Sequence, residues 1–121
     1  MQAREHFQDG VQVVQLSGEI DMRSSPELRE ILAEHAEQKR AALLLDLSGV
    51  EYIDSSGLAT MVEYVQRSLT FDGRFGVSGL SERLRTIFDL ARLGEVLPIF
   101  TSLDEARSAL MSPQDPPGRA R

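Results

Sequence analysis

The chain of 121 residues contains no cysteine, no tryptophan and only two histidines, His6 and His35. The absence of cysteine excludes a disulfide framework, a thiolate metal site and a cysteine nucleophile, and it is compatible with a reducing compartment. Two histidines alone are too few for a zinc site. The chain also lacks a glycine-rich phosphate loop, which leaves nucleotide binding unsupported. We therefore expect no metal and no cofactor.

Long apolar runs and an excess of positive charge are absent as well. Residues 1–7 lack the apolar stretch of a secretory signal, and no run approaches the roughly 20 residues of a membrane span. Thirteen Lys and Arg stand against 19 Asp and Glu, a formal net charge of -6. Such a surface repels nucleic-acid phosphates and anionic lipid headgroups. These features predict a cytoplasmic protein without nucleic-acid binding or direct membrane insertion, and leave protein partners with basic grooves open.

What is present is an ordinary globular composition, with 41% hydrophobic and 26% charged residues. The length is typical of one domain of roughly 100–150 residues, which excludes a two-domain enzyme with a separate cofactor module. Residues 112–121 include Pro113, Pro116, Pro117 and Gly118 and no apolar anchor. We therefore expect one folded domain over residues 1–111, followed by a disordered C-terminal tail over residues 112–121.

Hydrophobic patterning predicts several strands. Residues 3–8 and 11–17 are expected to pair across Asp9-Gly10, a dipeptide favoured in tight hairpin turns. Residues 42–47 form a nearly continuous apolar run, which is typical of a strand covered on both faces at the centre of a parallel sheet. Residues 74–78 and 96–100 supply two more strands.

Helical patterns lie between and after these strands. The first helix begins near Ser24, either with Ser24 and Glu27 in a capping box or with Ser25 as the cap and Pro26 in the first helical position. Alternation of strands and helices predicts an α/β fold, with a mixed sheet of four to five strands and about four α-helices. Three further helices are predicted. The second helix has an apolar stripe from Leu58 to Leu69, the third is capped by Ser81, and the fourth is capped by Thr101 or Ser102.

The most informative segment is the turn Asp54-Ser55-Ser56-Gly57, which follows a buried strand and leads directly into a helix. Ligands and partners of α/β sheets usually bind beyond the carboxyl ends of strands. The first turn of the helix offers unpaired N–H groups, which would stabilise a phosphate on a hydroxyl there. Because Gly57 has no side chain, it is expected to leave the surface beside the hydroxyls low, so that the backbone of a partner can approach closely. The alternative interpretation is an ordinary helix cap, although capping alone needs fewer polar groups.

A second polar cluster, Glu19 and Asp21, also follows a strand and precedes a helix. Because both connections lie at strand ends, Asp21 is expected near Asp54 and Ser55. It would then orient a serine hydroxyl or complement a partner. The alternative is that Glu19 and Asp21 are loop residues that support the first helix.

Four segments in this order resemble a STAS domain, most closely the bacterial anti-sigma factor antagonists, which are phosphorylatable switch proteins. The resemblance extends over about residues 3–111. It rests on Leu-Ser-Gly-Glu-Ile-Asp at 16–21, Leu-Asp-Leu-Ser-Gly-Val at 45–50, Tyr-Ile-Asp-Ser-Ser-Gly-Leu at 52–58, and Leu-Gly-Glu-Val-Leu-Pro-Ile-Phe at 93–100.

The resemblance implies a non-enzymatic switch. In that family the first serine after the aspartate of the turn is phosphorylated by a serine kinase that is also the anti-sigma factor, so the matching residue is Ser55. The unphosphorylated chain would capture the kinase and free a sigma factor, and a serine phosphatase acting on phospho-Ser55 would restore binding. The residues expected to contact the partner are Asp21, Asp54, Ser56, Gly57 and Leu58.

Other interpretations of the same turn stay open at this point. A serine hydrolase would need a Gly-x-Ser-x-Gly elbow, which is absent, and a base, for which only His6 and His35 are available. A scaffold in a stress-signalling assembly, or an accessory of a lipid-transport ATPase, would use the same surface without phosphate turnover. Met22 is a further candidate contact, whereas Leu58 also fits the buried stripe of its helix.

Overall fold

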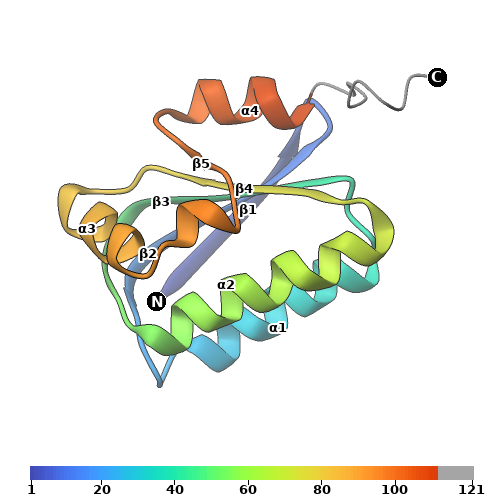
Figure 1. Cartoon of the computed structure of the whole chain (residues 1–121). Helices are drawn as coiled ribbons and strands as arrows, with labels where there is room; N and C mark the ends of the chain where they lie inside the picture. Colours follow the sequence, from blue (N-terminus) through green and yellow to red (C-terminus); the bar gives the residue numbers. More distant parts are fainter. Residues whose placement is uncertain (112–121) are drawn as a thin grey trace.

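The computed structural model describes residues 1–111; the predicted tail, 112–121, lies outside the described residues. A five-stranded mixed sheet and four α-helices make up this part of the chain, so the predicted α/β class is confirmed. In chain order the elements are β1 (Gln2–Gln8), β2 (Val11–Ile20), α1 (Ser25–Glu37), β3 (Ala42–Ile53), α2 (Ser55–Ser68), β4 (Arg74–Ser78), α3 (Glu82–Leu90), β5 (Ile99–Phe100) and α4 (Leu103–Met111), with short 3-10 turns at Leu69–Phe71 and Leu93–Glu95 (Figure 1).

The strands lie side by side in sequence order, β1-β2-β3-β4-β5. Only the β1–β2 pair is antiparallel. Its turn has Asp9 at φ 55° and Gly10 at φ 81°. Two consecutive positive φ values match the twist of a hairpin, which confirms the predicted turn.

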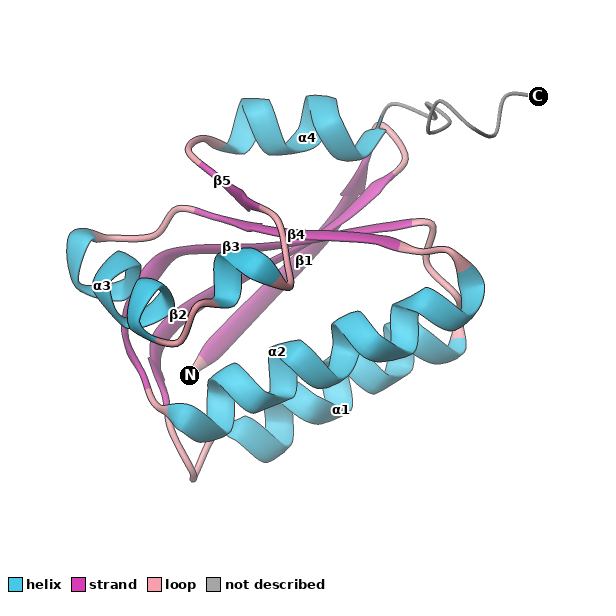
Figure 2. Ribbon diagram, in the orientation of Figure 1, coloured by secondary structure: helices cyan, strands magenta, loops and turns pink. Residues whose placement is uncertain are grey.

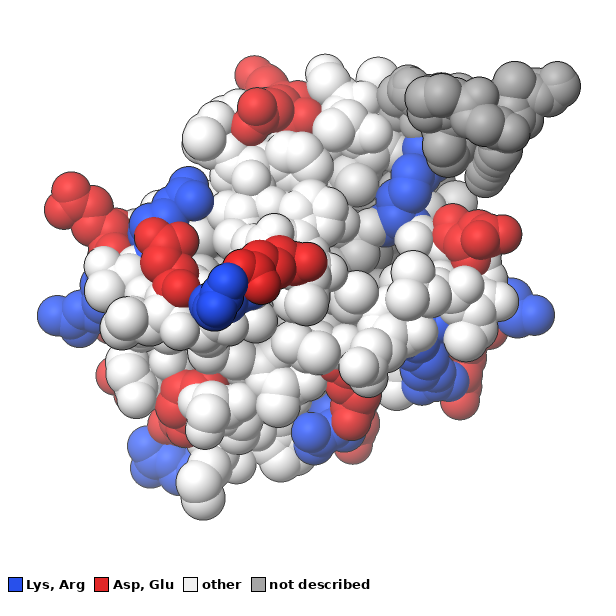
Figure 3. Space-filling view, in the orientation of Figure 1, with Lys and Arg blue, Asp and Glu red and all other residues white. Residues whose placement is uncertain are grey.

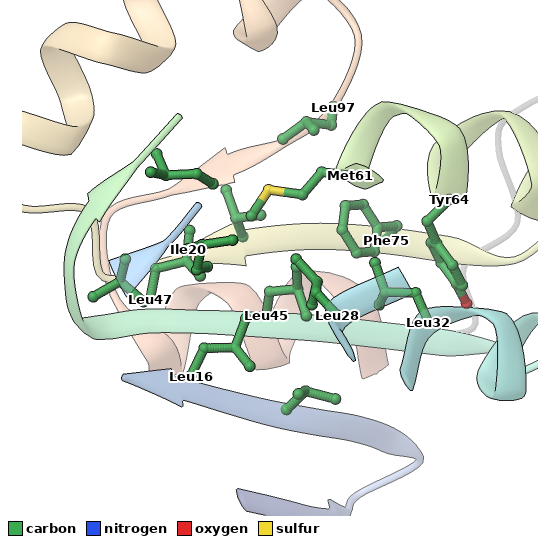
Figure 4. Close-up of a cluster of buried hydrophobic side chains, with 14 of the residues drawn as sticks. Leu16, Ile20, Leu28, Leu32, Leu45, Leu47, Met61, Tyr64, Phe75 and Leu97 are labelled. Carbon is green, nitrogen blue, oxygen red and sulfur yellow. The ribbon is translucent and has the colours of Figure 1, made fainter. Parts of the chain in front are cut away.

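Each face of the sheet packs against different helices (Figure 2). Side chains of β2 and β3 alternate, so that Leu16 and Leu45 join the larger core between the sheet and helices α1 and α2, whereas Val13 and Leu44 join a smaller core with Ala106 of α4. Figure 4 shows the larger core, where side chains from the sheet meet those of α1 and α2. All of residues 42–47 are buried, as predicted for a strand covered on both faces.

Three strands differ in length from the prediction. Strand β2 continues past Ser17 to Ile20. Strand β3 continues through Ser48-Gly49 to Ile53, because Gly49 lets it approach β2 closely; a Cβ there would lie 2.9 Å from Ser17 Cβ. The strand predicted over 96–100 contains only Ile99 and Phe100. The N–H groups of Val96 and Leu97 instead bond to the carbonyl of Leu93, and Pro98 has no N–H to donate.

The predicted helix caps are confirmed at two of three places. Ser81 Oγ accepts from the Leu84 N–H, and Ser102 Oγ accepts from the Glu105 N–H. At α1 both proposed cap arrangements are wrong: Ser24 occupies the N-cap position without a side-chain cap hydrogen bond, and Ser25 is already helical. The Ser24 hydroxyl instead forms hydrogen bonds within the preceding loop, with the Asp21 N–H and the Glu19 carbonyl.

Candidate functional site

The turn Asp54-Ser55-Ser56-Gly57 lies where β2 and β3 end side by side. The Asp54 N–H donates to the Ile20 carbonyl at 3.0 Å, which ties the end of β3 to the end of β2. Helices α1 and α2 both start from this edge and run in the same direction beneath the sheet (Figure 1). The two polar connections therefore meet at one edge of the domain.

Asp54 caps α2 with one carboxylate oxygen. Its Oδ1 accepts from the Ser56 N–H at 2.9 Å, from the Ser56 hydroxyl at 2.6 Å and from the Gly57 N–H at 3.3 Å. These bonds, that of the Ser56 hydroxyl first, hold the pKa of Asp54 below its ordinary value, against the opposing effects of desolvation and of the Asp21 charge. The carboxylate therefore stays ionised at neutral pH and fixes the start of the helix.

The two serines of the turn differ in their surroundings. The Ser56 hydroxyl is engaged with Asp54. Ser55, the first residue of α2, is exposed, and within residues 1–111 no group hydrogen-bonds its hydroxyl. A partner can therefore reach Ser55 Oγ without breaking a hydrogen bond, whereas modification of the Ser56 hydroxyl would break its 2.6 Å bond to Asp54.

Gly57 and Leu58 face the interior more than the surface. Gly57 is buried, and a Cβ there would lie 2.7 Å from Ile20 Cγ2 and 2.7 Å from Ile53 Cγ1. The expectation that Gly57 keeps the outer surface low is therefore wrong, because its missing side chain lets α2 approach the ends of β2 and β3. Leu58 is partly buried and packs against the larger core.

Asp21 organises the β2–α1 loop. Its Oδ1 accepts from the N–H groups of Arg23 at 2.9 Å and Ser24 at 3.2 Å. The Ser24 hydroxyl accepts from the Asp21 N–H and donates to the Glu19 carbonyl. The bond from the Arg23 N–H contributes most to lowering the pKa of Asp21. The hydrogen bond from the Asp54 N–H to the Ile20 carbonyl brings Asp54 next to the residue that precedes Asp21, as expected from the strand-end positions, and the Asp21 charge opposes the lowering of the Asp54 pKa.

Neither histidine contacts this site. His6 lies exposed on β1. His35 is buried in the last turn of α1, at the opposite end of the helix pair from Ser55; its Nδ1 accepts from Arg40 Nε at 3.0 Å and its Nε2 lies 2.6 Å from Glu5 Oε1. With Nδ1 accepting, the ring proton is on Nε2 and is donated to Glu5. The structure therefore provides Ser55 with no histidine base.

Three further observations concern the described residues 1–111. No cluster of three or more His, Cys, Asp or Glu side chains is arranged to hold a metal ion there. None of the helices in this part of the chain has the length and apolar character to cross a membrane. Basic and acidic side chains are interspersed on the face shown in Figure 3.

Comparison with known proteins identifies the family. The model of the STAS domain family matches residues 2–106. The chain belongs to the STAS domain family. The predicted resemblance is thereby confirmed, and the same architecture recurs in the solved structures of anti-sigma factor antagonists.

One relative and two solved structures show how this STAS chain compares. It is 40% identical over 86 residues to the anti-sigma-B factor antagonist of Bacillus subtilis, covering 71% of this chain and 78% of the relative. It is 32% identical to an anti-sigma factor antagonist from Mycobacterium paratuberculosis, with a TM-score of 0.85 over 92% of this chain and 94% of that one. The Bacillus cell fate determinant SpoIIAA in its phosphorylated form shares the fold, at 18% identity and a TM-score of 0.69, over 90% and 99% of the two chains.

Sequence reasoning about this STAS chain missed how the β2–α1 loop is built. Ser24 looked like a helix cap but serves the loop, and Met22 at the loop tip is 75% exposed. A polar hollow beside the loop is lined by Glu19, Asp21 and Glu27 among others. The sequence marks Met22 as a candidate contact, an apolar residue between Asp21 and Arg23, and the structure shows that its side chain is exposed.

Proposed function

We propose that this protein is a cytoplasmic anti-sigma factor antagonist whose partner binding is switched by phosphorylation of Ser55. In the unphosphorylated state it binds an anti-sigma factor that is also a serine kinase, and a sigma factor is released. Phosphorylation by that kinase ends the complex, and a serine phosphatase acting on phospho-Ser55 restores it. The observation that carries the proposal is the contrast between the exposed, unbonded hydroxyl of Ser55 and the engaged hydroxyl of Ser56.

A phosphate suits this position in the isolated domain. Ser55 lies in the first turn of α2, where the N-terminal end of the helix dipole favours negative charge. The fold would therefore tolerate the roughly -1.5 to -2 charges of a phosphoserine. The switch then operates through the surface and not through unfolding.

The same charge is unfavourable in a complex. The neighbouring carboxylates of Asp21 and Asp54 are both ionised, so a phosphate adds to negative charge already present. If the partner covers Ser55, the added charge is buried without a counter-charge, which costs on the order of 2–5 kcal/mol. That cost corresponds to a loss of affinity of roughly 30- to several-thousand-fold.

The remaining site residues receive distinct roles in this proposal. Asp21 and Asp54 present carboxylates to basic groups of the partner, and Asp54 with Ser56 fixes the start of α2. Gly57 and Leu58 act indirectly, by seating α2 against the ends of β2 and β3.

The proposal is tested by titration calorimetry against the anti-sigma factor encoded in the same genome. Ser55→Ala should bind at least as tightly as the unmodified chain and resist phosphorylation, whereas Ser55→Asp should bind at least about 30-fold more weakly. Ser56→Ala is the matched control, because Asp54 keeps its two backbone hydrogen bonds. It should still be phosphorylated. Equal affinities for Ser55→Ala and Ser55→Asp would disprove the electrostatic switch.

A further inference from the structure

Met22 is an exposed apolar side chain in an otherwise polar loop. It is 75% exposed, and its neighbours Asp21, Arg23 and Ser24 are all polar. Other large apolar side chains are equally exposed elsewhere, for example Leu90 at 80% on α3. Exposure alone therefore does not indicate a binding role for Met22, and the inference rests on its surroundings.

The loop holds Met22 outward through hydrogen bonds on both sides of it. The Ser25 N–H donates to the Asp21 carbonyl at 2.7 Å, in addition to the bonds of the Asp21 carboxylate to Arg23 and Ser24. The Ser24 hydroxyl donates to the Glu19 carbonyl at 3.0 Å. This network fixes the backbone of the tip before any partner arrives, so little backbone entropy remains to be lost on binding.

Met22 lies within reach of any partner that covers Ser55. The hydrogen bond between the Asp54 N–H and the Ile20 carbonyl, 3.0 Å long, joins the two loops. Met22 is two residues from Ile20 and Ser55 is one from Asp54, so their Cα atoms are no more than about 18 Å apart even along a fully extended path. An interface of standard size, about 800 Å² on each partner, extends roughly 30 Å across. A partner whose contact area includes Ser55 and extends over the β2–α1 loop would therefore also cover Met22.

Carboxylates outnumber basic groups around this apolar tip. Glu19, Asp21 and Glu27 line the polar hollow beside it together with Met1, Arg23 and Ser24, and Asp54 lies across the Ile20 hydrogen bond. The one cation of the tip, Arg23, is paired with Asp21 at 3.3 Å. A complementary surface would therefore have an apolar socket with a basic rim.

We propose that Met22 is the apolar anchor of the complex and enters such a socket on the anti-sigma factor. The inference rests on the proposed function, because it takes that partner to be seated over Ser55. A flexible thioether adapts to an irregular pocket, and its transfer from water stabilises the complex whatever the state of Ser55. Met22 therefore contributes equally to the affinity of the unphosphorylated and the phosphorylated protein. The phosphorylation of Ser55 sets how much these two affinities differ.

The test measures the affinity of the same anti-sigma factor for variants at position 22, each with Ser55 and with Ser55→Asp. Met22→Ala should weaken binding about tenfold or more in both backgrounds, and Met22→Leu should stay within about threefold of the parent. The matched control is Leu90→Ala, on α3, which should change affinity less than about twofold. At about 1 M salt, where charges are screened beyond about 3 Å, the tenfold effect of Met22→Ala should persist.

The outcomes separate this inference from the proposed function. If Met22→Ala binds like its parent while Ser55→Asp binds weakly, the anchor is disproved and the switch stands. If Met22→Ala is weakened but Ser55→Asp is not, the anchor stands and the switch is disproved. Equal losses for Met22→Ala and Leu90→Ala would also overturn the anchor, since they would show a general effect of removing exposed apolar area.

Discussion

Replacing Gly57 by alanine tests how α2 is seated at the site. A Cβ at this position would lie 2.7 Å from Ile20 Cγ2, 2.7 Å from Ile53 Cγ1 and 3.0 Å from Ile53 Cδ1. The first two contacts are with atoms next to the branch points of buried isoleucines, which have little freedom to move. We therefore expect the clash to be relieved by a shift of the start of α2.

The expected change in the free energy of unfolding follows from a comparison with Gly94→Ala. A Cβ at Gly94 would have only Ile99 Cδ1 near it, at 3.8 Å, an ordinary contact. Gly94→Ala should therefore leave the free energy of unfolding unchanged or raise it by about 0.4–1 kcal/mol through the reduced entropy of the unfolded chain. Gly57→Ala has a similar entropic gain but also an overpacking cost of about 1–3 kcal/mol. The difference between the two variants should thus be about 1–3 kcal/mol.

Urea denaturation of the two variants measures this difference directly. At equal m-values, the Gly57→Ala midpoint should lie below that of Gly94→Ala, with a melting temperature lower by about 4 °C for each kcal/mol. A Gly57→Ala protein as stable as Gly94→Ala would refute the reasoning, because it would mean that α2 does not depend on close approach to Ile20 and Ile53.

Two further predictions concern the site and the caps. Because the pKa values of Asp21 and Asp54 lie below the ordinary 3.8 in the folded protein, both carboxylates stabilise the fold above about pH 4, and this contribution is lost as the pH falls through the lowered values. An NMR titration should find both midpoints below 3.8; a midpoint above it for either would contradict the hydrogen bonds described. Ser81→Ala removes the cap of α3 and should lower the free energy of unfolding by about 0.5–2 kcal/mol, whereas Ser81→Asp, which restores an acceptor, should recover most of it. Equal losses for both would show that the cap bond does not stabilise α3.

The parts of the fold that depend on local pattern could be predicted from the sequence. Asp9-Gly10 can adopt two positive φ values, which makes the hairpin predictable. Residues 42–47 are almost all apolar and have no polar face to turn toward water, which makes the central strand predictable. The extension of β3 beyond Leu47 could not be predicted, because the lack of a side chain at Gly49 matters only once Ser17 of β2 lies beside it, with its Cβ 2.9 Å from where a Gly49 Cβ would be.

The site shows the same division between local and tertiary causes. Helix capping by the Asp54 turn follows from residue types that lie next to one another in the chain. The role of Gly57 does not, since Ile20 is far away in sequence and becomes its neighbour only in the folded domain. The Ser24 hydroxyl could bond either to the first turn of the helix or to the preceding loop. At the end of β2 the Glu19 carbonyl lies within reach, and the hydroxyl bonds there.

The most direct test of the switch is to map phosphate on the protein purified from its native cells, before and after stress. Peptide mass spectrometry locates the modified residue and its occupancy. The account predicts phosphate on Ser55, with occupancy that changes with stress, and none on Ser56, whose hydroxyl is engaged with Asp54. Phosphate on Ser56, or a chain that is unmodified under every condition, would contradict it.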